Sequence, residues 1–377
     1  MKKSILFTGI VAGMLCFPSC KEDDKTILQT PTSFVLNTPP YAENYLYDLE
    51  KSTAIELTCS QPDYGYTAVT TYQVQVSLTP DFKTAESFET LKTTYTMAKM
   101  EVKASEVAVA ATNLGLAAGK AEEDFPLTLP VYLRLRATVA NGLEPITSNI
   151  VELSNCRLHF ALPPVELPTE MNMVGSALGG WEWGSHAIEM VPVHSTPGAF
   201  WHIVYLEENG EIKFNEIKED SETEFSFTGT TFDGELEADA AISDKDGNIK
   251  IGKSGWYLMV VRTTLSGRDR NYTVEFNKPN VYLTGDAVGN WDQKPEDLFS
   301  VPETKEGDFI SPAIKAVPGE GGLRMCVKLN TDWWKTEFIF FGGKIAYRGA
   351  GNDQDRISAA VGEKVYLNFM TGSASLK

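Results

Sequence analysis

Apolar and polar residues alternate along much of the chain, with the period of two that is typical of half-buried strands. Over residues 131–139 the odd positions are apolar and the even positions carry tyrosine, arginine or threonine. Residues 71–78 alternate in a similar way. A helix is predicted only for a short segment at residues 101–116. The pattern therefore predicts an all-β protein.

A run of prolines separates two strand-rich parts of the chain. The first part, residues 26–163, is predicted to fold as an immunoglobulin-like or fibronectin-III-like sandwich. Pro163, Pro164 and Pro168 then interrupt the pattern, as expected of a semi-rigid connector between domains. We therefore expect a domain boundary at this point.

The remainder of the chain contains an internal repeat. Four residues recur at a separation of 110 positions: Gly175, Ala177, Gly179 and Trp181 are matched by Gly285, Ala287, Gly289 and Trp291. Further matches keep the same order, among them residues 212–214 with 323–325 and residues 223–225 with 336–338. The repeat predicts two tandem β-sandwich modules, a middle module at 164–277 and a C-terminal module at 278–377.

The N-terminus has the pattern of a secreted bacterial lipoprotein. Two lysines precede an apolar run over residues 5–17, which is too short to span a bilayer as a mature helix. A small residue before Cys20 resembles the junction at which a cysteine is lipidated. We expect residues 1–19 to be a signal peptide, Cys20 to carry the lipid, and residues 20–25 to form an acidic tether. The acidic cluster in this tether resembles the signal that sends some lipoproteins to the outer face of the outer membrane. An ordinary secretory signal with an incidental cysteine is the alternative.

The charge balance limits the partners of the protein. The chain has 33 basic and 51 acidic residues, and its formal charge of −18 becomes −20 if the two lysines of the signal peptide are removed. Such a surface repels nucleic acid and anionic lipid. Nucleic acid is therefore not expected as a partner, and attachment to the membrane is expected to depend on acyl chains.

No pattern of residues indicates catalysis, a metal or a cofactor. The four histidines are scattered, and the motifs of hydrolases, zinc proteases and phosphate-binding loops do not occur. Asp244 begins a segment like a calcium loop, but the twelfth position is Gly255 where a glutamate is required. Cys59, Cys156 and Cys326 lack the spacing of a zinc site, and either free buried thiols or one Cys59–Cys156 bridge would fit. We expect a protein that is not an enzyme.

All seven tryptophans lie in the repeat region. Trp201 and Trp256 belong to apolar strand segments and are expected in the core. Trp181 and Trp291 follow glycine-rich stretches, which predicts that they lie in loops. An exposed indole suits the C–H face of a pyranose ring, while nearby basic and amide side chains can bind its hydroxyls. A capping contact over the end of a small sandwich is the alternative role for these indoles.

These features together resemble the SusE/SusF group of starch-utilisation outer-membrane lipoproteins, over essentially the full chain. The resemblance rests on the Ser19-Cys20 junction, on residues 34–39 (Phe-Val-Leu-Asn-Thr-Pro) and on a module that opens with Gly285-Asp286-Ala287 and Trp291. It implies a non-catalytic protein of the SusE type that captures starch or maltooligosaccharides at the cell surface. A TonB-dependent transporter and companion surface lipoproteins are the partners that it implies.

The resemblance also implies a site in each module, made of two aromatic residues with arginine or lysine and polar side chains. In the C-terminal module the matching residues are Trp291, Trp334, Arg324, Arg348 and Asn352. In the middle module they are Trp181, Trp183 and Lys213, a less complete set. We therefore expect the C-terminal site to dominate, with Trp334 as its main anchor.

Three other functions remain open at this stage. The same architecture could bind another polysaccharide, or the chain could be a surface adhesin or structural subunit whose tryptophans are all core. A glycoside hydrolase is the third, because the many acidic residues could supply a pair of catalytic carboxylates.

Overall fold

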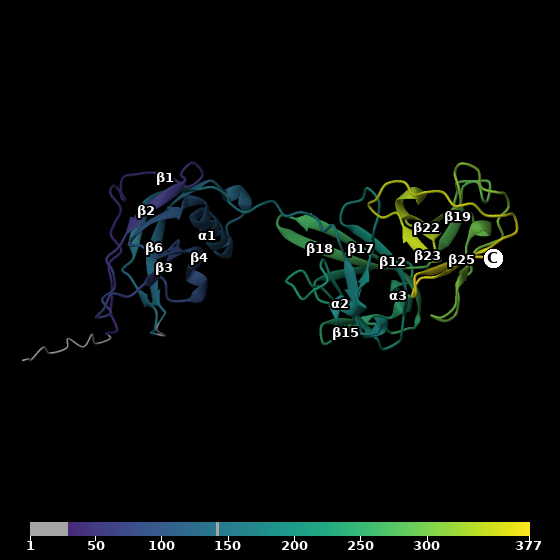
Figure 1. Cartoon of the computed structure of the whole chain (residues 1–377), viewed down its shortest axis with the longest axis horizontal. Helices are drawn as coiled ribbons and strands as arrows, with labels where there is room; N and C mark the ends of the chain where they lie inside the picture. The colour runs from purple at the N-terminus through teal and green to yellow at the C-terminus, as the bar shows by residue number, and fades with distance from the viewer. Residues whose placement is uncertain (1–28, 141–142) are drawn as a thin grey trace, which may run out of the picture. The chain divides into compact units, whose positions relative to one another are not determined.

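The computed structural model describes residues 29–140 and 143–377 (Figure 1). The predicted signal peptide, the tether and Cys20 lie outside the described residues. The chain divides into two compact units at the Pro163–Pro164 bond. Strands dominate both units, which confirms the prediction of an all-β protein. Within the described part of the chain, no helix is both long enough and apolar enough to cross a membrane.

The first unit is a sandwich of a large and a small sheet. The large sheet has the order β1-β8-β6-β3-β4, with β7 paired to β6, and the small sheet pairs β2 with β5. The strands are β1 (Tyr47–Asp48), β2 (Ala54–Thr58), β3 (Thr70–Ser77), β4 (Glu89–Tyr95), β5 (Lys99–Lys103), β6 (Leu127–Val139), β7 (Ile146–Thr147) and β8 (Val151–Leu158). The alternation over residues 131–139 is confirmed, because its odd positions up to Ala137 are fully buried.

Among the described residues of the first unit, one α-helix completes the core. The predicted helical segment is confirmed as α1 (Ala104–Ala117), and one-turn helices η1 (Ala85–Ser87) and η2 (Glu122–Asp124) lie in the connections. Val107, Ala108 and Ala111 of α1 are buried in the same core as Cys59 and Cys156. Both cysteines are free thiols. Burial raises the pKa of Cys156 to about 12, so this thiol stays protonated and unreactive.

The middle module consists of two five-stranded sheets, ordered β10-β9-β13-β16-β15 and β11-β12-β17-β18-β14. The strands are β9 (Asn172–Val174), β10 (Ile188–Glu189), β11 (Val191–Pro192), β12 (Ala199–Leu206), β13 (Glu211–Asn215), β14 (Thr230–Asp233), β15 (Ser243–Lys245), β16 (Asn248–Lys250), β17 (Gly255–Ser266) and β18 (Asp269–Asn277), with short helices η3 (Ser176–Leu178), α2 (Trp183–His186) and α3 (Glu237–Ala240). The segment that begins at Asp244 is a hairpin turn, in which the Gly247 N–H donates to Asp244 Oδ1 at 2.8 Å.

The C-terminal module is built on one seven-stranded sheet of order β19-β21-β22-β23-β25-β24-β20. Its strands are β19 (Val281–Thr284), β20 (Phe309–Ile310), β21 (Arg324–Val327), β22 (Glu337–Phe341), β23 (Lys344–Tyr347), β24 (Val365–Asn368) and β25 (Ser373–Leu376), and its one-turn helices are η4 (Pro295–Asp297) and η5 (Trp333–Thr336). The internal repeat has a structural counterpart, because β9 pairs with β13 as β19 pairs with β21.

The two modules of the second unit share a hydrophobic core, in which β12 and β17 of the middle module face the C-terminal module (Figure 1). Trp201 on β12 is fully buried, and its ring lies edge-on to Tyr347 at 5.5 Å between centroids. Trp256 on β17 meets Phe309 in the same way at 5.0 Å. The expectation that both tryptophans are core residues is confirmed, and the core they fill is the one between the modules.

The opposite faces of the same two strands are also buried. Phe200, Val204, Tyr257 and Met259 pack into the middle module's own core. His202 is buried on β12 and hydrogen-bonded to the Ile203 carbonyl at 2.9 Å, and desolvation lowers its pKa to about 4. It is therefore neutral at physiological pH and adds no charge to the centre of the unit.

Candidate functional site

Trp291 lies on the surface of the C-terminal module, in the loop that follows β19. Its side chain is 45% exposed. Gly285 at the start of this loop has a φ of 80°, and a Cβ there would lie 2.9 Å from the Trp291 indole. Glycine is therefore needed for the loop to hold the ring in this position. The Trp291 ring stacks on that of Trp333, with centroids 4.9 Å apart and planes inclined by 29°.

Trp334 follows Trp333 in the chain, but its ring contacts different residues. Trp333 and Trp334 are the first residues of η5, and successive residues of a 3-10 helix point about 120° apart. The half-buried Trp334 ring meets the His194 ring edge-on at 5.3 Å, and the guanidinium carbon of Arg348 lies 5.5 Å from its centroid. Trp333 and not Trp334 is thus the stacking partner of Trp291.

A buried carboxylate connects the two arginines predicted for the site. Glu337 on β22 is 1% exposed, and it forms ion pairs with Arg324 Nη1 through one oxygen and with Arg348 Nη1 at 3.1 Å through the other. Arg324 also donates to Asp353 Oδ1 at 3.2 Å. Its guanidinium carbon lies 5.9 Å from the Trp333 ring. Burial lowers the pKa of Arg324, and the hydrogen bond to Asp353 offsets part of this effect.

The C-terminal site residues therefore form one continuous series of contacts, which we call the C-terminal arc. In order of contact they are Trp291, Trp333, Arg324, Glu337, Arg348 and Trp334, of which Arg324 and Glu337 are buried. The structure brings together four of the five residues predicted for this site and adds Trp333 and Glu337. Asn352, the fifth, is exposed in the loop after β23. In the same loop a hydrogen bond from Arg356 holds the pKa of Asp353 well below its usual range.

The three residues predicted for the middle module also lie together. Lys213 Nζ on β13 is 5.7 Å from the Trp181 ring centroid and 5.4 Å from that of Trp183. Both carboxylate oxygens of Glu224 lie 2.8 Å from the same ammonium. Trp181 is 37% exposed, whereas Trp183 is 6% exposed. This site therefore presents one open indole, and its cation is already paired.

The two sites share a plan that follows from the repeat. Lys213 and Glu224 occupy the positions that match Arg324 and Glu337, so each module has a cation–carboxylate pair beside an indole, which is Trp181 in the middle module and Trp333 in the C-terminal module. The C-terminal module differs by adding Arg348, which is the second cation on the shared carboxylate. The recurrence of the carboxylate in the repeat is a signal from which Glu337 could have been predicted.

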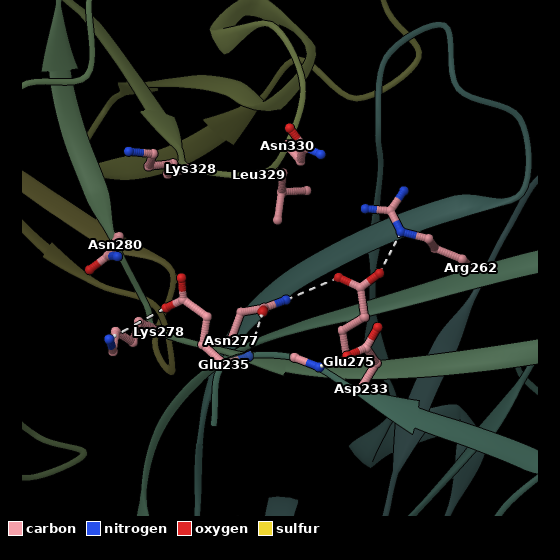
Figure 2. A pocket seen from close by; sticks show the side chains of 11 residues that line it. Asp233, Glu235, Arg262, Glu275, Asn277, Lys278, Asn280, Lys328, Leu329 and Asn330 are labelled. Carbon is pink, nitrogen blue, oxygen red and sulfur yellow. Dashed lines mark hydrogen bonds and ion pairs between the residues drawn. The ribbon is translucent and has the colours of Figure 1, made fainter. Parts of the chain in front are cut away.

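A separate cleft of about 720 Å³ lies between the end of β18 and the segment that leads to η5 (Figure 2). Its side chains are mostly charged or amide groups, and many are paired with one another. Arg262 Nε lies 2.5 Å from a Glu275 oxygen, and the Asn277 amide donates to Glu275 at 3.1 Å. No aromatic ring is among the described residues that line this cleft. It therefore lacks the stacking surface that the C-terminal arc has.

Two related β-sandwich modules, each with an indole beside a paired cation, define a protein with tandem carbohydrate-binding modules. The chain belongs to the SusF/SusE family, because the model for SusF/SusE starch-specific carbohydrate-binding modules matches residues 170–275 and 280–375. A model for the SusE outer membrane protein matches residues 21–136. These matches confirm the resemblance and the internal repeat, and they indicate an outer-membrane protein built from binding modules rather than catalytic domains.

Two relatives agree with this membership. Outer membrane protein SusF of Bacteroides thetaiotaomicron is 41% identical over 231 residues, which are 58% of this chain and 45% of that protein. The match thus spans less than half of the relative's length. The crystal structure of SusF from Bacteroides thetaiotaomicron superposes with a TM-score of 0.50 at 22% identity, covering 92% of this chain and 99% of that chain. At this identity the likeness shows the fold alone.

Proposed function

We propose that the protein is a non-catalytic starch-binding protein of the outer membrane, which captures α-1,4-glucan or maltooligosaccharides. The observation that carries the proposal is the C-terminal arc, in which indoles stand at both ends of a pair of arginines. An indole face covers the C–H groups of a glucose ring, and a guanidinium donates to neighbouring hydroxyls. The description of the matching modules as starch-specific supports glucan as the ligand.

The middle module is proposed as a second, weaker site. Trp181 is its one open indole, and the Lys213 ammonium is neutralised by Glu224. A weak site still contributes to capture of a polymer, because a second contact on the same unit becomes an intramolecular event once the first has formed. The acidic balance of the chain has little effect on such a ligand, since the glucan carries no charge.

Retardation in native gels tests this function directly. We expect the soluble chain from Lys21 onward to be slowed in gels that contain amylopectin and to run normally in gels that contain dextran or xylan. The double variant Trp181→Ala/Trp334→Ala should lose the retardation, because it removes one indole from each site. Retardation by xylan but not amylopectin would assign another polysaccharide, and none in any gel would favour an adhesin or structural subunit. Release of reducing sugar from amylopectin would instead indicate a hydrolase.

We further propose that the chain is anchored by a lipid on Cys20 and faces the cell exterior, beside a TonB-dependent transporter and companion surface lipoproteins. The Ser19-Cys20 junction and the acidic residues after it support the anchor and the export. We expect Cys20→Ala to abolish incorporation of a palmitate analogue and to release the protein from the outer membrane. Cys16→Ala is the matched control and should keep the label. Undiminished label in Cys20→Ala would contradict the assignment.

A further inference from the structure

His194 lies in the turn between β11 and β12 of the middle module and contacts the C-terminal module at three points. Its backbone N–H donates to the Lys335 carbonyl at 2.9 Å. Its ring Nδ1 lies 2.9 Å from the Gly349 carbonyl oxygen. Its ring edge meets the Trp334 indole at 5.3 Å between centroids. His194 therefore contacts two separate segments of the C-terminal module, one at Trp334 and Lys335 and the other at Gly349.

Each of these contacts falls on a residue of the C-terminal arc or on its immediate neighbour. Lys335 follows Trp334, and Gly349 follows Arg348. The Gly349 carbonyl can only accept a hydrogen bond, so Nδ1 of His194 carries the proton in this contact. His194 thereby connects the main chain next to Trp334 with the main chain next to Arg348, and its ring packs against the Trp334 indole.

The turn that carries His194 is itself firmly held. Ser195 has a φ of 51°, a left-handed conformation that is unusual for a residue other than glycine. The Val193 N–H donates to the Ala199 carbonyl at 2.8 Å and the Thr196 N–H to the Val193 carbonyl at 3.0 Å, which closes the turn. β12 then continues directly to Trp201 in the core shared by the modules. The imidazole is thus presented from a rigid base.

We propose that His194 is a positioning residue of the C-terminal glycan site, so that this site is complete only when the middle module is packed beside it. The inference rests on the proposed function, because it assigns a role within that same site. Without the imidazole, Trp334 loses its edge contact and the Gly349 carbonyl loses its donor. The indole and the Arg348 guanidinium would then sample more orientations, and each bound glucan would have to order them again.

Binding of maltoheptaose to the soluble full chain, measured by calorimetry, tests the inference. All variants carry Trp181→Ala so that the middle site does not contribute. We expect His194→Ala to weaken binding about tenfold. His194→Asn keeps a donor near the place of Nδ1, and His194→Phe keeps the ring edge, so each should restore part of the affinity. Glu208→Gln, an exposed position just after β12 in the same module, should bind like the parent.

The partial rescue distinguishes positioning from general destabilisation, and thermal unfolding of each variant shows whether it is folded. A folded His194→Ala variant that binds within about twofold of the parent would overturn the inference. If His194→Ala does not fold, the other two variants decide. Weaker binding by His194→Asn or His194→Phe than by the parent supports the inference, and binding as tight as the parent's by both variants overturns it. Trp334→Ala in the same background separates the two proposals. If Trp334→Ala loses binding while His194→Ala does not, only the role of His194 is wrong. Unchanged binding in both shows that Trp334 is not an anchor of the site, which overturns the role of His194 as well, and loss of starch binding by the parent chain itself would overturn the proposed function.

Discussion

Replacement of Trp334 by alanine should weaken binding of maltooligosaccharide at the C-terminal site by about thirtyfold or more. Loss of one aromatic anchor from a small site costs about 2 kcal/mol or more, and each 1.4 kcal/mol is about tenfold in affinity. Arg348→Ala should have a smaller effect, because water can replace part of a hydrogen bond to a hydroxyl but cannot replace a stacking face. Calorimetry with the full chain in the Trp181→Ala background measures both.

The full chain is required for this measurement, because an isolated C-terminal module would expose the residues that pack against Trp201 and Trp256. Trp333→Ala is the informative comparison. It removes the ring that stacks on Trp291 and leaves the Arg348–Trp334 pair in place. Parental affinity in a folded Trp334→Ala variant, together with loss of binding in Trp333→Ala, would mean that the Trp291–Trp333 stack is the platform and that Trp334 serves the contact between the modules.

Local patterns were sufficient to predict the strands and the repeat. The alternation over residues 131–139 reports one buried face, so it predicts β6 without any knowledge of its partners. The repeat predicted in the same way that the candidate residues of the middle module lie together. Trp181 and Lys213 were paired through their matches in the second copy, and equivalent positions in two copies of a fold lie at equivalent places.

The partner of Trp291 was not predictable from the same patterns. Two adjacent tryptophans point to opposite faces in a strand and about 120° apart in a 3-10 turn, and a polar surrounding does not distinguish these cases. Trp291 and Trp333 are far apart in the sequence, so their contact depends on the path that the chain takes from the end of β21 to η5. Composition and spacing along the chain do not describe that path.

The shared core had a signal in the sequence. Residues 199–206 are apolar almost without interruption, which is typical of a strand that is buried on both faces. In the structure, Trp201 and Ile203 face the C-terminal module while Phe200 and Val204 face the middle module's own core. A continuous apolar run thus predicts a central strand, but it does not identify which element covers the second face.

The largest loss of stability is expected for Trp201→Ala. The indole is fully buried, and its neighbours Phe338 and Tyr347 come from the other module, so the change leaves a large cavity between the two. Truncation of a buried tryptophan costs about 3–5 kcal/mol. Because β12 also supplies residues to the middle module's own core, both modules should lose stability together. Urea unfolding of the full chain, followed by tryptophan fluorescence, measures the change in the free energy of unfolding.

Trp181→Ala is the matched control for this experiment, since it removes an indole of the same size from the surface of the same unit. It should change the free energy of unfolding by no more than about 0.5 kcal/mol. The prediction would be wrong if Trp201→Ala lowered the free energy of unfolding by less than about 1 kcal/mol. It would also be wrong if the middle module alone were destabilised and the C-terminal module unfolded at the same urea concentration as in the parent. Either outcome would mean that the modules fold independently, because the energy of their shared core depends on both being present.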